Sequence, residues 1–285
     1  MIAENFEYAA PSTLEEALQL LADPEAKALA GGMSLIPLMK LRLAAPGRLV
    51  DLRRVQELKT IRRNGGALHI GALATHSEIE SSPAVRSRCP LLAETASHIG
   101  DLQVRNMGTI GGSIAHNDPA ADYPAALLAL EAQVKIAGQG TERVVGLEEL
   151  LVDAMVTALE PGELITEVIV PVDGEATGTS YQKMRQPASG FAIVGVAARV
   201  TKSNGKIGRA RIGVTGLGPT GFRARKAEEL LEGSSGSEEE IRRAAAAAAE
   251  GVEANSDLHA SAEYRRHLAA VYTARAVRAA LARAS

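Results

Sequence analysis

Two short glycine-rich segments, each following an apolar run, constrain this chain more than any other feature. The central one is Thr109-Ile-Gly-Gly-Ser113, and a second of the same kind is Ala30-Gly-Gly-Met-Ser34. Adjacent glycines allow positive φ angles and let successive backbone N–H groups approach a bulky anion. The flanking hydroxyls add donors that can turn toward phosphate oxygens. A single Gly-Gly pair usually marks only a tight turn, but the repetition predicts one extended, phosphate-bearing ligand held at two points.

The composition excludes several classes of protein. With 285 residues the chain is long enough for two domains, and no apolar run reaches the roughly 18 residues of a membrane span. The single cysteine, Cys89, rules out an internal disulfide and a cysteine-held iron–sulfur cluster on this chain. A net charge of −3 with interspersed signs gives no indication of nucleic-acid binding. Because residues 1–8 lack the basic and apolar regions of a signal peptide, we expect a cytoplasmic protein.

The first part of the chain, about residues 1–56, is predicted to be a small α/β unit. An apolar-aromatic run within residues 1–10 favours an edge strand, and Ser12 with Glu15 has the capping-box spacing for the next helix. The other elements are expected at residues 26–30 (strand), 35–43 (helix) and 48–52 (strand). The first glycine segment therefore enters a helix N-terminus, whose N–H groups lack intrahelical partners and suit an anion.

Residues 57–172 are predicted to form an antiparallel α+β part, which completes a first domain at residues 1–172. Asn64-Gly-Gly66 between two short apolar runs is a hairpin signature. The expected helices cover residues 75–80, 89–99 and 122–130, and the strands of an antiparallel meander cover residues 134–137, 140–145 and 163–171.

A turn-rich link at residues 172–180 is followed by a predicted second domain, at residues 176–285. Its strands are expected at residues 180–185, 192–201 and 206–216, and its helices at residues 223–232, 237–253 and 261–284. Six consecutive alanines at 244–249 favour a close helix–helix contact. A three-stranded antiparallel sheet followed by three helices indicates a smaller α+β domain, so the whole chain is assigned to the α+β class.

Gly216-Leu-Gly-Pro-Thr-Gly221 matches the dinucleotide pattern G-x-G-x-x-G, between a strand and a helix. No second parallel strand with a terminal acidic residue follows, and Pro219 lacks one N–H that would face a pyrophosphate. We therefore interpret residues 216–221 as a strand-to-helix turn.

The two glycine segments and their surroundings resemble a known family. The first continues to Leu43, and the second begins at Gln103-Val-Arg-Asn-Met-Gly and continues as His116-Asn-Asp-Pro-Ala-Ala-Asp122. These are similar to the paired signatures of the medium, FAD-binding subunit of molybdenum hydroxylases, which include aerobic carbon monoxide dehydrogenase, xanthine dehydrogenase and related aldehyde or N-heteroaromatic dehydrogenases. The similarity spans essentially the whole chain. It implies a two-subdomain FAD-binding domain of the PCMH type, followed by the smaller domain.

The resemblance also implies roles for individual residues. Asp122 would accept hydrogen bonds from ribityl or ribose hydroxyls, Ile165 would pack near the flavin, and Lys183 would approach its C2 carbonyl–N1 edge. Phe191 would stack on the isoalloxazine but offers no hydroxyl, and Met33 stands where relatives often have a polar residue. The residues implied to clasp the pyrophosphate and line its pocket are Ala30, Gly31, Gly32, Met33, Ser34, Leu35, Thr109, Ile110, Gly111, Gly112 and Ser113.

Structural explanations remain open for several of these residues. Asp122 is also placed to cap the following helix, Phe191 to be a core aromatic, and Lys183 to be a solvated strand residue. His98 and His116 have no nucleophile or metal-ligand pattern around them, so no catalytic or metal-binding residue is predicted.

The function implied is electron transfer without substrate chemistry. FAD on this chain would take electrons from [2Fe–2S] clusters on a small partner subunit and pass them to an external acceptor. The molybdenum cofactor would lie on a large partner subunit, in a dimer of heterotrimers that is cytoplasmic or peripheral at the inner face of the membrane. Two alternatives stay open: a stand-alone FAD oxidase or reductase, and a flavin-free assembly subunit. The substrate of the large subunit and the final acceptor are not specified by these residues.

Overall fold

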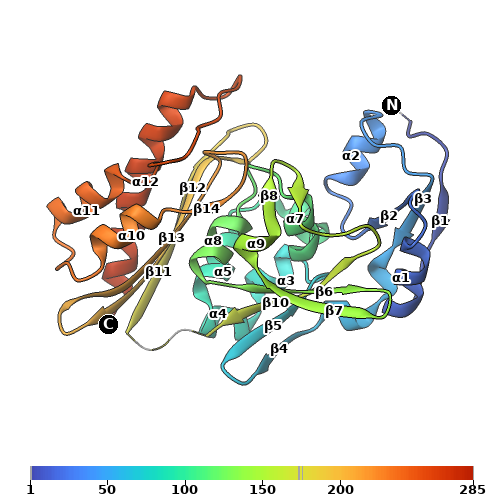
Figure 1. Cartoon of the computed structure of the whole chain (residues 1–285), viewed down its shortest axis with the longest axis horizontal. Coiled ribbons are helices and arrows are strands. Elements are labelled where there is room, and N and C mark those ends of the chain that lie inside the picture. The colour runs from blue at the N-terminus through green and yellow to red at the C-terminus, as the bar shows by residue number, and fades with distance from the viewer. Residues whose placement is uncertain (1, 173, 175, 285) are drawn as a thin grey trace.

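The computed structural model describes residues 2–172, 174 and 176–284, and it arranges them around three larger β-sheets and a small two-stranded one (Figure 1). The N-terminal sheet and its two helices lie at one end of the molecule, and the C-terminal helices lie at the other. Between them, a central sheet and a group of short helices form the middle of the molecule. The predicted α+β class is confirmed. No helix in the described part of the chain has the length and apolar character to cross a membrane.

The N-terminal sheet has the order β1-β3-β2, with both pairings parallel. Its capping differs from the prediction, because the side chain of Thr13, not Ser12, accepts the hydrogen bond from the Glu16 N–H. The second helix ends earlier than predicted, before Arg42, which has a φ of 60°. The elements are β1 (Glu7–Ala9), α1 (Leu14–Leu21), β2 (Ala26–Leu29), α2 (Leu35–Lys40), β3 (Arg48–Asp51) and the 3₁₀ turns η1 (Leu52–Arg54) and η2 (Gln56–Lys59).

The central sheet is antiparallel throughout and has the order β4-β5-β10-β6-β7. The predicted strands are present, but the predicted meander is wrong in one respect. The last strand, β10, inserts between β5 and β6 instead of following β7 at the edge, and this makes it a buried central strand. The strands are β4 (Ile61–Asn64), β5 (Ala67–Gly71), β6 (Gln133–Gly138), β7 (Thr141–Gly146) and β10 (Leu164–Pro171).

The middle of the molecule contains more helices than the three predicted. The additional ones are short, and two of them contain or adjoin glycines, so hydrophobic periodicity alone did not indicate them. The elements are α3 (His76–Ser81), α4 (Pro83–Arg88), α5 (Pro90–Ser97), α6 (Leu102–Met107), α7 (Ile110–His116), α8 (Tyr123–Ala129) and α9 (Leu147–Leu150), with the small hairpin β8 (Leu151–Asp153) and β9 (Val156–Thr157).

The C-terminal sheet has four strands in the order β11-β12-β13-β14, not the predicted three. Residues 216–221 lead into the two-residue strand β14, so they do not connect a strand directly to a helix. Part of the predicted link, residues 173 and 175, lies outside the described residues, and β11 begins at Thr177. The elements are β11 (Thr177–Arg185), β12 (Ala192–Ser203), β13 (Lys206–Thr215), β14 (Phe222–Arg223), α10 (Arg225–Leu231), α11 (Glu238–Ala246) and α12 (Ala262–Arg283).

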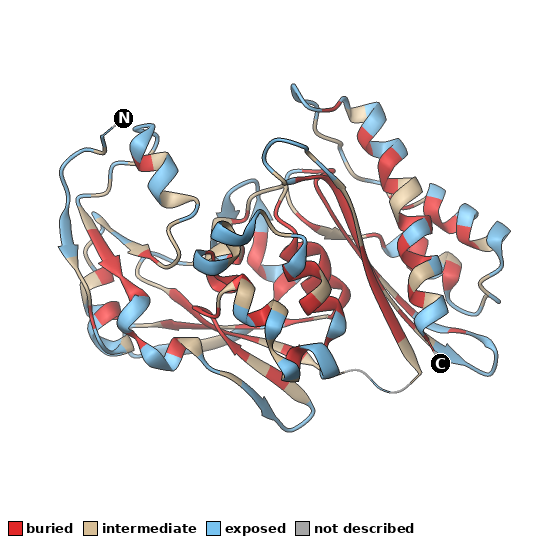
Figure 2. Ribbon diagram, turned by 180° about the vertical axis from the view of Figure 1, so that it is seen from behind, coloured by how far each residue is buried: buried red, intermediate tan, exposed pale blue. Residues whose placement is uncertain are grey.

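The C-terminal sheet is covered on both faces, because successive side chains of a strand point to opposite sides. Tyr181 and Ala197 belong to the core of the middle of the molecule, whereas Val194 and Val196 pack toward α10, α11 and α12. Ala244 and Ala245 of α11 are buried in that second core, as predicted for a close helix–helix contact, and so is Ala248 beyond the helix. The predicted helix at residues 237–253 is too long, because α11 ends at Ala246 and turns follow. Figure 2 shows buried residues concentrated in the sheets and the helices between them.

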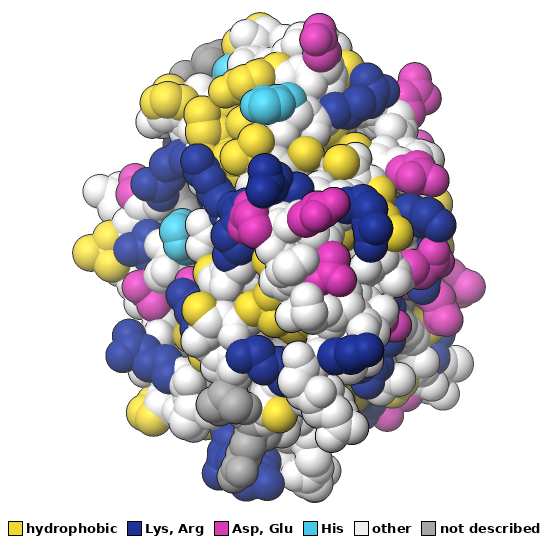
Figure 3. Space-filling view, turned by 90° about the vertical axis from the view of Figure 1, so that its left-hand side faces the viewer, with side chains coloured by type: hydrophobic (Ala, Val, Ile, Leu, Met, Phe, Trp, Pro, Cys, Tyr) yellow, Lys and Arg dark blue, Asp and Glu magenta, His cyan; other side chains and the backbone are white. Residues whose placement is uncertain are grey.

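A charged cluster joins α8 to the C-terminal sheet. Glu131, at the end of α8, contacts the guanidinium groups of Arg199, Arg209 and Arg211 at 2.6–3.3 Å. The outer face over the C-terminal helices carries interspersed charges of both signs (Figure 3), including the ion pair between Arg278 and Glu238. An exposed pair such as Arg278–Glu238 contributes little to stability.

Candidate functional site

The fold brings the two glycine segments into direct contact. A Cβ atom added to Gly31 would overlap the backbone carbonyl of Met107, which ends α6 just before the second segment. A Cβ atom on Gly112 would lie 3.7 Å from the Cβ of Ala30. Only a residue without a side chain fits at Gly31, because the two backbones approach so closely there. The segments are thus two sides of one site, although about 75 residues separate them in the sequence.

Residues 30–35 form a loop rich in unused hydrogen-bond donors. Gly32 has a φ of 74°, in the left-handed region that the prediction anticipated. Within the described part of the chain, the backbone N–H groups of residues 31–35 have no protein acceptor, and the Ser34 hydroxyl makes no hydrogen bond. Successive N–H groups around a left-handed residue form a concavity that binds anions.

Residues 109–113 adopt a different conformation from the one predicted. Thr109 caps α7, and Gly111 and Gly112 lie in its first turn with ordinary helical angles, so they are not a positive-φ loop. The N–H groups of Ile110 and Gly111 donate to the carbonyls of Ala74 and Ala72, and that of Gly112 donates to Thr109 Oγ1 at 3.1 Å. This segment therefore offers a ligand the space beside Gly112 and the Ser113 hydroxyl rather than a row of N–H groups.

Asp122 and Lys183 form a buried ion pair. Lys183 Nζ lies 2.8 Å from Asp122 Oδ1 and 2.9 Å from Oδ2, and it also donates to the carbonyl of His98 at 3.0 Å. The two side chains are 4% and 1% exposed, so the solvated position considered for Lys183 is wrong. Asp122 occupies the N-cap position of α8, but its side chain makes no capping bond. Burial raises the pKa of Asp122 and lowers the pKa of Lys183, because it penalises both charges, while their mutual attraction opposes both shifts.

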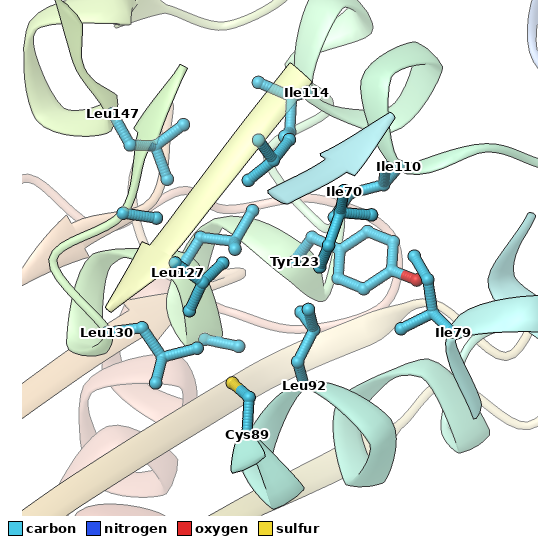
Figure 4. Packing of buried hydrophobic residues seen from close by; sticks show 14 of the residues in the cluster. Ile70, Ile79, Cys89, Leu92, Ile110, Ile114, Tyr123, Leu127, Leu130 and Leu147 are labelled. Carbon is cyan, nitrogen blue, oxygen red and sulfur yellow. The ribbon is translucent and has the colours of Figure 1, made fainter. Parts of the chain in front are cut away.

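A second buried contact, between His76 of α3 and Tyr123 of α8, lies beside the start of α7. The ring of His76 packs edge-on against Tyr123, with Nδ1 3.2 Å from the Tyr123 hydroxyl, and it closes over Gly108, which leaves no room for a Cβ. Tyr123 lies among Ile70, Ile110 and other core side chains (Figure 4). His76 and Tyr123 therefore fix the start of α7 and the start of α8 relative to each other. Neither was predicted, because a lone histidine beside apolar residues gives no distinctive sequence signal.

His76 makes stability depend on pH. Burial, reinforced by the nearby charge of Arg105, lowers the pKa of His76 to about 4. Since the unfolded chain takes up this proton near pH 6.5, the unfolded state gains stability as pH falls. We expect this residue to lower the free energy of unfolding by about 2 kcal/mol at pH 5 relative to pH 8. Chemical denaturation of the wild type and of His76→Gln tests this: the variant should lose about 2 kcal/mol less between these pH values, and equal losses would contradict the assignment.

The remaining predicted residues occupy different environments. Ile165 is 5% exposed and lies within the central core, where β10 pairs with β6. Phe191 is 46% exposed at the start of β12, so the core aromatic considered for this position is wrong. Leu35 is half-buried at the start of α2, and Met33 is 39% exposed beside it. No group of three or more His, Cys, Asp or Glu side chains in the described residues is arranged to hold a metal ion.

Comparison with known proteins covers nearly the whole chain. Residues 4–173 match the family of FAD binding domains in molybdopterin dehydrogenases, and residues 179–280 match the CO dehydrogenase flavoprotein C-terminal domain. The carbon monoxide dehydrogenase medium chain of Hydrogenophaga pseudoflava is 39% identical over 285 residues, which cover 99% of each chain. The solved carbon monoxide dehydrogenase of the same organism superposes with a TM-score of 0.97 over 100% of both chains, at 41% identity. Quinoline 2-oxidoreductase from Pseudomonas putida 86 has a TM-score of 0.95 at 35% identity, over 100% of this chain and 99% of that one.

The fold and these matches define a two-part flavoprotein architecture. The chain belongs to the family of FAD-binding medium subunits of molybdenum hydroxylases, which are parts of multi-subunit oxidoreductase complexes. The family expected from the glycine segments is thereby confirmed.

Proposed function

We propose that this chain binds FAD along the line from the two glycine segments to the Asp122–Lys183 pair and relays electrons within a molybdenum hydroxylase complex. The observation that carries the proposal is the loop at residues 30–35, which lies against the start of α7 and whose N–H groups at 31–35 have no protein acceptor among the described residues. A pyrophosphate needs several convergent donors, and this loop supplies them without breaking any existing hydrogen bond. Ser113, in the first turn of α7, would add a hydroxyl donor.

Asp122 and Lys183 would contact the flavin half of the ligand. In the chain, Asp122 follows the end of α7 by six residues, and we propose that the ligand extends from the glycine segments to the Asp122–Lys183 pair. The carboxylate would accept hydrogen bonds from ligand hydroxyls, and the ammonium would place a positive charge near the ring. Phe191 offers an exposed ring for stacking, and Ile165 would contribute only the small part of its surface that is exposed.

The bound FAD would accept electrons from the iron–sulfur clusters of a partner and deliver them to an external acceptor. This chain would bind the flavin, orient it and set the charge around it. We further propose that the FAD-binding domain comprises residues 1–172 and the C-terminal domain residues 176–285. Assembly with a large molybdenum subunit and a small iron–sulfur subunit, as a dimer of heterotrimers in the cytoplasm or peripheral at the inner face of the membrane, completes the proposal.

The test is the visible spectrum of the chain, purified alone and after co-expression with its genomic neighbours. We expect flavin bands that bleach on substrate addition only in the co-expressed complex, and the bleaching substrate identifies the reaction class. A complex that contains molybdenum and iron–sulfur clusters but stays free of flavin contradicts the proposal.

A further inference from the structure

Tyr181 contacts the buried ion pair between Asp122 and Lys183, but the family resemblance assigns it no role. Its hydroxyl donates to Asp122 Oδ1 at 2.5 Å, and its side chain lies in the core at 1% exposure. On β11, Tyr181 and Lys183 are two residues apart, so both point to the same face of the sheet, toward α5 and α8. One strand therefore presents both a hydroxyl and an ammonium to a single carboxylate.

The position of this hydroxyl is fixed by its surroundings. Gly195 pairs with Lys183 across the sheet, and a Cβ atom at Gly195 would overlap the Tyr181 hydroxyl. The ring of His98 packs edge-on against that of Tyr181, with centroids 5.7 Å apart, and the Tyr181 N–H donates to Glu94 of α5. These contacts hold the phenol in place, because protein cores are closely packed.

We propose that Tyr181 is a positioning residue for the flavin site, whose hydroxyl holds the Asp122 carboxylate in the orientation and ionised state that keep Lys183 in place. The inference rests on the proposed function, because Asp122 and Lys183 are assigned there to the flavin. Without the hydroxyl, Asp122 Oδ1 loses one of its two donors while it remains buried, and its ionised form becomes less favourable.

The result of a pH experiment depends on the charged and titratable groups around the Asp122–Lys183 pair. Lys183, Tyr181 and Arg185 face it from β11, His98 from the end of α5, Glu94 from α5 itself, and Tyr123 from α8. In Tyr181→Phe the pKa of Asp122 rises, so the carboxylate is neutralised at a higher pH than in the wild type. His98 is present in both proteins, so comparing their affinities removes the part of its titration that does not depend on the Asp122 charge.

The experiment is an FAD titration of the deflavinated complex at pH 6, 7 and 8, with wild type and Tyr181→Phe. We expect the variant to bind FAD about tenfold more weakly at pH 8, the loss typical of one hydrogen bond to a charged group, and the ratio to grow as pH falls. Tyr272→Phe is the matched control, because among the described residues its hydroxyl has a hydrogen bond only to the Met184 sulfur, on the other face of the sheet. It should bind like the wild type at every pH.

The outcomes separate the inference from the proposed function. A wild-type complex that takes up no FAD overturns the proposed function and the inference with it. A wild type that binds FAD while Tyr181→Phe binds equally well, or more weakly by the same factor at every pH, overturns only the inference. For a Tyr181→Phe protein that does not fold, 3-fluorotyrosine at position 181 serves instead. This residue keeps nearly the shape of tyrosine, and its hydroxyl is a stronger hydrogen-bond donor. The fall in FAD affinity with decreasing pH should therefore begin at a lower pH than in the wild type. An unchanged pH profile would contradict the positioning role of Tyr181.

Discussion

Replacing Gly112 by leucine is expected to weaken FAD binding by about 10- to 100-fold, because the new side chain fills the space between the two glycine segments. Gly112 faces that space, with only Thr109 Oγ1 at 2.8 Å and the Ala30 Cβ at 3.7 Å near an added Cβ. The fold should tolerate the change. Leucine gains about 1 kcal/mol over glycine in a helix, and disturbing the Thr109 cap costs about the same. Equilibrium titration with FAD and chemical denaturation measure the two effects separately.

Two other glycines serve as controls for this experiment. Gly111→Ala places a Cβ 2.5 Å from the Cβ of Ala72, so it should lower the free energy of unfolding by about 1–3 kcal/mol through overpacking. Gly66→Leu, in the β4–β5 turn, meets nothing within 4 Å and should leave FAD binding unchanged. A Gly112→Leu protein that binds FAD as tightly as Gly66→Leu would refute the assignment of the pyrophosphate to this space.

The sequence was informative where one local pattern determined the structure. Hairpins marked by Asn-Gly sequences, helices with a clear apolar stripe and the strand-then-helix order of the C-terminal part were all predicted. The family was predicted from the two glycine segments, because their combination of residues is rare in other proteins. The errors have physical causes. β14 has only two residues, and α7 begins with glycines that a propensity argument assigns to a loop.

Long-range packing explains what the sequence did not reveal about the site. The insertion of β10 between β5 and β6 depends on which strand buries best, which no local pattern encodes. Tyr181 was not predicted because its partner lies 59 residues away and a tyrosine in a strand is unremarkable. Gly31 was predicted to contact a ligand, and the fold adds that a Cβ atom there would overlap the carbonyl of Met107. In these cases the residue itself can be recognised in the sequence, but the group that it contacts is known only from the folded structure.

Removing the charge of Lys183 is expected to destabilise the protein strongly, and removing Asp122 as well is expected to restore stability but not FAD binding. Lys183→Met leaves the Asp122 carboxylate buried without its cation, which should cost about 3–5 kcal/mol in the absence of FAD. This deficit should shrink as pH falls, because the folded variant then takes up a proton on Asp122 that the unfolded chain binds only at lower pH. In Lys183→Met/Asp122→Asn neither member of the pair is charged, so stability should return to within about 1–2 kcal/mol of the wild type.

The double variant separates a structural role of the pair from a ligand-binding one. Arg225 and Glu148 form a matched control, because their pair is exposed and the corresponding variants Arg225→Met and Glu148→Gln should each cost less than about 1 kcal/mol. Denaturation of the single and double variants gives the coupling energy, and FAD titration gives the effect on the site. A buried ion pair adds little net stability compared with neutral residues. A double variant that is stable but does not bind FAD would therefore show that the pair is kept for the ligand. A double variant that binds FAD like the wild type would instead remove Asp122 and Lys183 from the flavin site.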